Sequence, residues 1–233
     1  MGKDNSTLDE IKDLMLNKCR LKQQVYQSTK ESFGILKEQL NEIGSELTKV
    51  NNDSPGQIDL EIVSQGEFEV KITIAGDTIV FHMHTNVFAF PPSHMVHRSP
   101  YIMKNPNSAY CGVINIYNFL ADSFRYHRLN DTGYLIGRIF VNSENHFFVE
   151  GKQHLGYRFN DFAAQKVSEA QLRNILEAAI KYSMSFDLFT PPYNAVDQVS
   201  LSDIIELNNH QKIKTAKRLG FKFQHSEDSK VDF

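Results

Sequence analysis

The sequence begins with a long, uninterrupted helical pattern. Residues 8 to 50 contain no proline, and apolar or near-apolar residues recur at steps of three and four, as on one face of an α-helix. They are Leu8, Ile11, Leu14, Leu21, Val25, Phe33, Leu36, Leu40, Ile43, Leu47 and Val50. One helix over this range would be about 65 Å long, whereas the rest of the chain should fold into a body about 40 Å across. Something must therefore cover the overhanging part.

The spacing within this stripe indicates what the cover is. Steps of three and four alternate in two blocks, the heptad pattern of a coiled coil, and the blocks meet through Thr29 in a stutter next to Gly34. We predict that residues 1–52 form a coiled-coil helix and that the protein self-associates, as a dimer, through residues 8–50. A helical hairpin folded back near residues 32–34 is the alternative.

A different pattern follows the helix. Turn-forming residues at positions 51–56 end it, and we predict an α+β domain over residues 53–226 and a flexible tail over 227–233. The domain should contain an antiparallel sheet of about six strands with C-terminal helices packed on one face. Its predicted strands are a three-stranded meander over 58–85 and single strands over 110–119, 134–141 and 146–150. A capping box at Ser168 begins one helix, and another is expected over about 203–219.

Alternating apolar and polar residues assign the faces of the meander. A two-residue turn at positions 76–77 would pair Ile72 with Phe81, and a three-residue loop ending at Gly66 would pair Leu60 with Val70. Buried positions then oppose buried positions throughout. The outer face carries two predicted cross-strand rows, Asp59–Lys71–His82 and Glu61–Glu69–His84.

The histidines carry the sharpest chemical signal. Two directly opposed glutamates in the second row would repel by roughly 0.2–1 kcal/mol unless a cation lies between them. A protonated histidine, in a pH-sensitive contact, or a divalent metal could supply it. The candidate metal ligands are Glu61, Glu69, His82, His84, His94 and His97. An ordinary solvated polar face explains the same residues, and we favour that interpretation.

Two further sets of residues could bind ligands. Arg125, His127 and Arg128 resemble an anion-binding patch, and Tyr157 and Phe159 could line a pocket of the sheet. Basic residues of the expected C-terminal helix could contact nucleic acid: Lys212, Lys214, Lys217 and Arg218. Their position near the end of a helix is also what the helix dipole favours, and no nucleic-acid-binding motif accompanies them.

Composition narrows the class of function. With 25 Lys and Arg against 28 Asp and Glu, the net charge of −3 demands no polyanionic partner. Two cysteines cannot build a disulfide framework, and no apolar stretch is long enough to span a bilayer. We therefore predict a cytoplasmic, oligomeric sensor, adaptor or assembly module that binds a ligand or partner without turnover. The alternatives are a metal-dependent hydrolase or oxygenase using His82 and His84 with Glu61 or Glu69, and a nucleic-acid binder.

Overall fold

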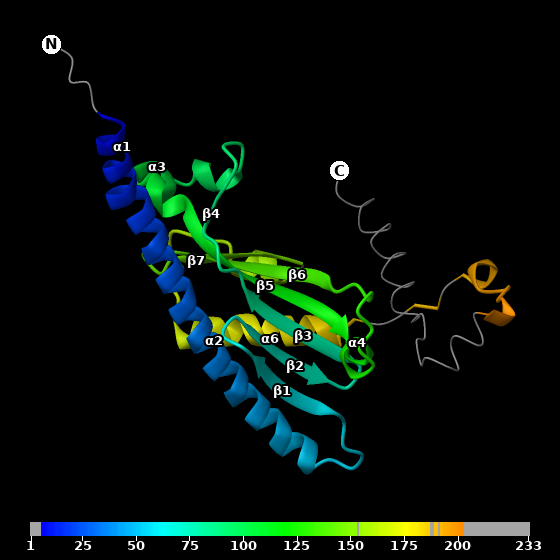
Figure 1. Cartoon of the computed structure of the whole chain (residues 1–233). Helices are drawn as coiled ribbons and strands as arrows, with labels where there is room; N and C mark the ends of the chain where they lie inside the picture. The colour runs from blue at the N-terminus through cyan, green and yellow to red at the C-terminus, as the bar shows by residue number, and fades with distance from the viewer. Residues whose placement is uncertain (1–5, 153, 187–188, 191, 203–233) are drawn as a thin grey trace.

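A computed structural model of the chain describes residues 6–152, 154–186, 189–190 and 192–202. Within these ranges the chain forms a long N-terminal helical run, a seven-stranded antiparallel sheet and a second long helix (Figure 1). The predicted α+β class is confirmed. Among the described helices, none combines the length and the apolar character that crossing a membrane requires.

The N-terminal helical run is continuous from residue 7 to residue 52. It consists of α1 (Thr7–Leu14), a π-helical turn (Met15–Cys19) and α2 (Arg20–Asn52). The alternative hairpin is wrong, because Gly34 lies in the middle of α2. The irregularity falls at the π-helical turn and not at Thr29, whose hydroxyl donates a hydrogen bond to the Val25 carbonyl within a regular part of α2.

The sheet follows the strand order β1-β2-β3-β5-β6-β7, with short β4 pairing with β5. The strands are β1 (Leu60–Gln65), β2 (Glu69–Ile74), β3 (Asp77–Met83), β4 (Phe88–Ala89), β5 (Tyr110–Leu120), β6 (Tyr134–Asn142) and β7 (Phe147–Gly151). The bounds predicted for the last three lie within one residue of those observed. A bulge in β6 shifts the register between Ile116 and Tyr117 of β5.

The turns of the meander differ from the predicted ones. Ala75 and Gly76 form the turn between β2 and β3, so Ile72 pairs with Ile79 instead of Phe81. The loop between β1 and β2 begins at Gly66, whose φ of +67° lies in the left-handed region that favours glycine. Both registers shift by an even number of residues, so each side chain keeps its predicted face and acquires different neighbours.

The two predicted cross-strand rows are therefore wrong. Glu61 lies opposite Thr73, and Glu69 lies opposite His82. Lys71 lies between Val63 and Val80, two apolar residues that contribute no charge. Because the turn between two strands sets their register, a choice between two plausible turns decided which charged side chains became neighbours.

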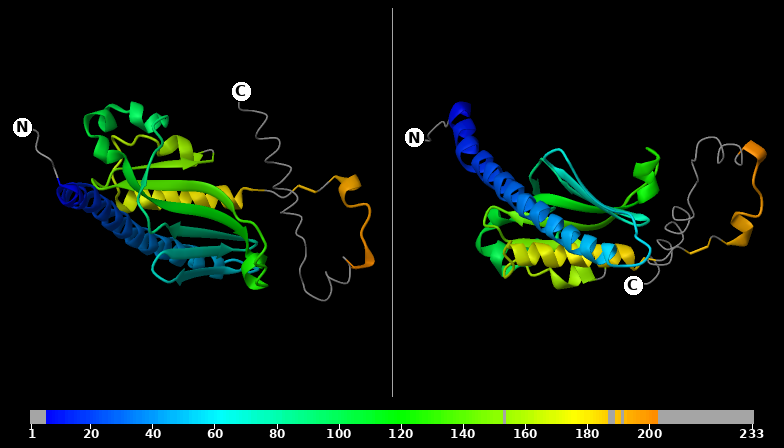
Figure 2. Two further views of the ribbon diagram at one scale, coloured as in Figure 1. Left: turned by 45° about the horizontal axis from the view of Figure 1, so that its top comes forward. Right: turned by 90° about the horizontal axis from the view of Figure 1, so that it is seen from below.

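Helices α2 and α6 (Glu169–Met184) cover one face of the sheet (Figure 2). They share one core with the strands, in which Phe33, Leu36, Phe81 and Leu176 are fully or almost fully buried. Packing of a C-terminal helix, α6, on one face is thus confirmed, whereas the packing of the N-terminal helix α2 beside it was not predicted. The helix ends at the predicted boundary of residue 52, yet its second half belongs to the same core as the sheet.

Ser168 caps α6 as predicted, because its hydroxyl accepts a hydrogen bond from the Gln171 N–H at 3.3 Å. Two shorter helices, α4 (Ala121–Arg125) and α5 (His154–Arg158), follow β5 and β7, and a 3₁₀ turn spans Tyr193–Ala195. The helix expected over 203–219 and the tail over 227–233 lie outside the described residues.

The segment between β3 and β5 covers one end of the outer face. It contains β4, a 3₁₀ helix (Met95–Arg98), α3 (Pro100–Lys104) and a second 3₁₀ helix (Pro106–Ala109). A smaller core lies beneath it, formed by Val96, Ile102, Ala109, Cys111, Val113, Phe140, Phe148 and Phe162. The proline-rich stretch is therefore an ordered cover over part of the sheet.

Candidate ligand pocket on the outer sheet face

A row of polar side chains crosses five strands of the outer face. Cross-strand pairing places them in the order Glu69–His82–Asn115–Arg138–Glu150. Residues directly opposite each other in a sheet project to the same side. The row ends at the edge of the covering segment, where a pocket of about 470 Å³ opens.

The pocket combines an apolar wall with a polar end. The wall consists of Phe88, Ala89, Phe90, Pro91, Val113 and Phe140, and the polar end of His84, His94, Asn115, Arg138 and Glu150. Ligand pockets commonly have this composition, with aromatic surface for affinity and a few polar groups for orientation.

His94 begins the 3₁₀ helix over Met95–Arg98, and both of its ring nitrogens have protein partners. Its Nδ1 accepts a hydrogen bond from the Val96 N–H at 3.2 Å, and its Nε2 lies 3.2 Å from Glu150 Oε1. An accepting nitrogen is unprotonated, so neutral His94 carries its proton on Nε2 and donates it to Glu150. The ring also stacks on Phe90, with centroids 4.6 Å apart.

Glu150 has partners on both carboxylate oxygens. Arg138 donates through Nη2 to Oε2, while His94 occupies Oε1. The Arg138 side chain is 44% exposed and that of Glu150 32%, so solvent screens the pair and its contribution to stability is at most about 1 kcal/mol. The guanidinium retains further N–H groups, whereas the carboxylate has no wholly free oxygen.

His84 is held in a similar way just after β3. Its Nδ1 accepts a hydrogen bond from the Asn86 N–H at 3.0 Å, and its ring meets the edge of Phe88 at 4.8 Å between centroids. Neutral His84 therefore carries its proton on Nε2. No described residue forms a hydrogen bond with that nitrogen.

Most of the polar groups in the pocket that remain free to bond a ligand are hydrogen-bond donors. They are the Nε2–H of His84, the remaining N–H groups of Arg138 and the amide of Asn115, for whose side chain the structure gives no partner among the described residues. The amide can also accept. Such a pocket suits a ligand with an acceptor group at one end and an apolar body at the other.

Part of the predicted metal set lies here, but the set is not assembled. His84 and His94 line the pocket, His82 lies next to Asn115 in the polar row, and the Nε2 of His97 bonds to the Phe90 carbonyl. Glu61 lies opposite Thr73, away from Glu69. Among the described residues, no group of three or more His, Cys, Asp or Glu side chains is arranged to hold a metal ion.

The five predicted ligand-binding residues do not form one site. Phe159 is 3% exposed and belongs to the main core, so it is not available to a ligand, whereas Tyr157 is 83% exposed. Arg128 pairs with Asp131 at 2.9 Å, and His127 has a positive φ of 49° at the end of α4. The basic residues Lys212, Lys214, Lys217 and Arg218 lie outside the described residues.

Arg125, the fifth, lines a separate pocket of about 560 Å³ together with Asp59, Glu61 and Lys71. Its guanidinium bonds to Asp59, and that hydrogen bond is the largest cause that raises the pKa of Arg125. The charges in this pocket are therefore largely paired with one another or exposed to water.

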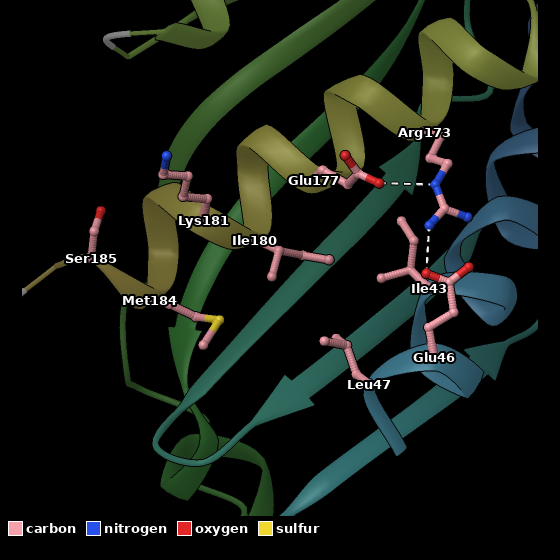
Figure 3. A pocket seen from close by; sticks show the side chains of 9 residues that line it. All are labelled: Ile43, Glu46, Leu47, Arg173, Glu177, Ile180, Lys181, Met184 and Ser185. Carbon is pink, nitrogen blue, oxygen red and sulfur yellow. Dashed lines mark hydrogen bonds and ion pairs between the residues drawn. The ribbon is translucent and has the colours of Figure 1, made fainter. Parts of the chain in front are cut away.

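A further pocket, of about 400 Å³, lies between the C-terminal part of α2 and the length of α6 from Arg173 onward (Figure 3). Ile43, Leu47, Ile180 and Met184 supply apolar surface. Arg173 donates to Glu46 at 2.7 Å and to Glu177 at 2.9 Å, and the bond to Glu46 is the largest cause that raises its pKa. Because its guanidinium is already engaged twice, this groove has less polar capacity for a ligand than the outer-face pocket.

The sequence pattern predicted the two histidines of the outer-face pocket as candidate site residues, but not Asn115, Arg138 or Glu150. A usable signal was present, since each is an isolated outward polar position within a correctly predicted strand. Parity along those strands would have placed the three on one face. Their proximity to His94 depends on a contact across 56 residues, which local pattern does not report.

Comparison with known proteins assigns no family: no family model matches the chain, and no curated protein or solved structure matches it significantly.

Proposed function

We propose that this protein is a non-catalytic binding module, a cytoplasmic oligomeric sensor or adaptor, whose outer-face pocket takes up a small carboxylate with an apolar body. One observation carries the proposal. In both His84 and His94, Nδ1 accepts a backbone N–H, so the other ring nitrogen is a donor. His94 Nε2 donates to Glu150, whereas His84 Nε2 has no partner among the described residues and is open to a ligand. Donors beside aromatic rings orient an acceptor group, whereas a general base would need a free, unprotonated nitrogen.

The residues of the pocket also offer little for turnover. Among the described residues that line it there is no Ser, Thr, Cys or Lys, the side chains that most often act as nucleophiles. Glu150 is engaged by His94 and Arg138. Cys111, on the same face, is fully buried in the smaller core, and burial raises the pKa of its thiol, which keeps it in the unreactive protonated form.

A carboxylate fits this donor set better than a phosphate. The planar guanidinium of Arg138 can present two parallel N–H groups to a carboxylate. A phosphate dianion would call for more positive charge than one half-exposed arginine beside Glu150 can provide. Phe88, Phe90 and Phe140 would contact the apolar body of the ligand.

Thermal-shift and calorimetric titrations with three probes that share one ring test this proposal: phenylacetate, phenylacetamide and phenethylamine. Phenylacetate should bind most tightly and stabilise the folded protein by an amount that rises with the logarithm of its concentration above the Kd, and phenethylamine should bind least. The substitution Arg138→Gln should weaken phenylacetate binding about tenfold, since it removes a charge-assisted hydrogen bond at a half-exposed position.

Arg125→Gln is a matched control. The Arg125 side chain is 50% exposed and pairs with a carboxylate, like Arg138, but it lines a different pocket. Phenylacetate affinity should be unchanged in this variant. The proposal is refuted if no probe binds at millimolar concentration, if the amine binds as tightly as the carboxylate, or if both arginine variants lose affinity equally.

The oligomeric part of the proposal concerns the N-terminal helix. Val25, Leu36 and Leu40 are fully buried within the protein's own core, so this part of the stripe is not free to contact another copy. The part before Val25 retains exposed apolar side chains. Both cysteines are free, Cys19 at the surface, which suits a reducing cytoplasm.

A further inference from the structure

We infer that residues 7–24 pair in antiparallel orientation with the same residues of a second copy of this chain. The inference rests on the self-association proposed above and adds to it the contact segment and the orientation of the two copies.

The first observation is exposure. α1 and the start of α2 project beyond the sheet and its covering helices (Figures 1 and 2). Five large apolar side chains stand more than half exposed there: Leu8 58%, Ile11 55%, Leu14 53%, Met15 58% and Leu16 53%. So many on consecutive turns of one helix mark an interaction surface. The stripe becomes buried only from Val25 onward.

The second observation is the distribution of charge. Residues 7–14 carry three acidic side chains, Asp9, Glu10 and Asp13, against Lys12, a net charge of 1 − 3 = −2. Residues 15–24 carry three basic side chains and no acidic one, a net charge of +3, from Lys18, Arg20 and Lys22. A parallel, in-register pair would place like charges together along its whole length, whereas an antiparallel pair places each acidic half beside a basic half.

The third observation is the position of the sheet. The free segment of 18 residues is about 27 Å long at 1.5 Å per residue. An antiparallel overlap centred near Met15 and Leu16 would set the two sheets at opposite ends of the pair. A parallel overlap would bring both to the same end, where α2 enters the core. The segment is already helical because α2 is anchored by the sheet, so pairing does not carry the cost of nucleating a helix.

Sedimentation and light scattering over a concentration series, on the full chain, measure the pairing itself. A reversible dimer is expected. Replacing Ile11 and Leu14 together by serine should weaken it at least about tenfold, since each loses most of its apolar surface. Replacing Gln27 and Glu31, two exposed residues of α2 outside the 7–24 segment, by serine is the control and should leave the dimer unchanged. All four side chains are exposed, so these variants should fold like the parent, which circular dichroism can verify.

Disulfide trapping then decides the orientation. In a chain carrying Cys19→Ser, either Leu8 or Met15 is replaced by cysteine. These positions lie seven residues apart and so share one face of a heptad helix. In an antiparallel pair, the central Met15→Cys should cross-link to its own copy and the terminal Leu8→Cys should not. In a parallel pair both should cross-link equally.

The outcomes separate the inference from the proposal beneath it. A dimer trapped through position 15 alone supports both. A dimer trapped equally through position 8 overturns the antiparallel inference and leaves self-association standing. A dimer that the serine pair at positions 11 and 14 leaves intact overturns the inference about residues 7–24 and leaves self-association standing. A protein that stays monomeric throughout the series overturns both.

Discussion

Two glycines of α2 allow a sharp test of how this helix lies on the sheet. Both Gly34 and Gly44 occupy its interior, where glycine is about 1 kcal/mol less favourable than alanine. A Cβ added at Gly34 would meet no atom within 4 Å, whereas one added at Gly44 would lie 2.1 Å from Ile62 Cδ1 and 3.2 Å from Ile62 Cγ1. The same substitution should therefore change stability in opposite directions at the two positions.

The magnitudes follow from these distances. Gly34→Ala should raise the free energy of unfolding by about 0.5–1 kcal/mol. Gly44→Ala has the same favourable effect on helix stability, but the added methyl group would clash with Ile62 of β1. Overpacking of this kind costs about 1–3 kcal/mol. Because Ile62 is only partly buried and can turn aside, we expect a net loss of about 1 kcal/mol at this position.

Denaturation by urea, followed by circular dichroism, measures both changes. The variant Ile62→Val removes the Cδ1 atom, so it should recover stability in the Gly44→Ala background while costing about 0.5–1 kcal/mol in the parent chain. A double-mutant cycle should give a coupling of about 1 kcal/mol. If Gly44→Ala stabilised as much as Gly34→Ala, or if the two changes were additive, α2 would not approach β1 at this point and the reasoning would be refuted.

Two other changes test the cap of α6 and the buried thiol. Ser168→Ala should lower the free energy of unfolding by about 1 kcal/mol, because the Gln171 N–H loses its acceptor. Ser168→Asp should retain most of the stability, because aspartate can also accept this hydrogen bond. Equal losses for the two variants in a urea titration would argue against the cap. Burial raises the pKa of Cys111, so the stability linked to its proton is complete below about pH 8.5 and declines as the pH rises above it, by up to about 1.4 kcal/mol per pH unit. Cys111→Ala should remove that decline, and a thiol reagent should modify Cys19 in the folded protein but Cys111 only after unfolding; rapid labelling of both would contradict the burial.

Prediction from sequence succeeded where one short stretch decides the outcome. The side chains of β2 and β3 lie on the predicted faces because alternation along a strand follows from its own backbone geometry. The helical run and the cap at Ser168 are local in the same sense. The predicted strand registers were wrong where two different turns were both compatible with the apolar pattern, as at Ala75 and Gly76. A shift of the pairing by two residues leaves every side chain on the same face of the sheet, so the pattern does not distinguish the two turns.

The candidate pocket shows the same division. Its histidines were recognisable as candidate site residues because four histidines lie close together in the chain, between positions 82 and 97. The partners of His94 were not, since Glu150 and Arg138 come from β7 and β6 and reach it only when the sheet assembles. Which part of the apolar stripe of the N-terminal helix is buried also became clear only from the tertiary structure. Phe33, Leu36 and Leu40 pack on the sheet, whereas the large apolar side chains between Leu8 and Leu16 remain exposed.

By itself, then, the sequence determined the helix, the strands and the direction of each side chain, because these depend on residues within a few positions of one another. The tertiary structure alone decided which polar groups meet across the sheet and which half of the helix is left exposed. The physical reason is that neighbours in space are set by strand register and by competition among apolar surfaces for burial, and both depend on the whole chain at once.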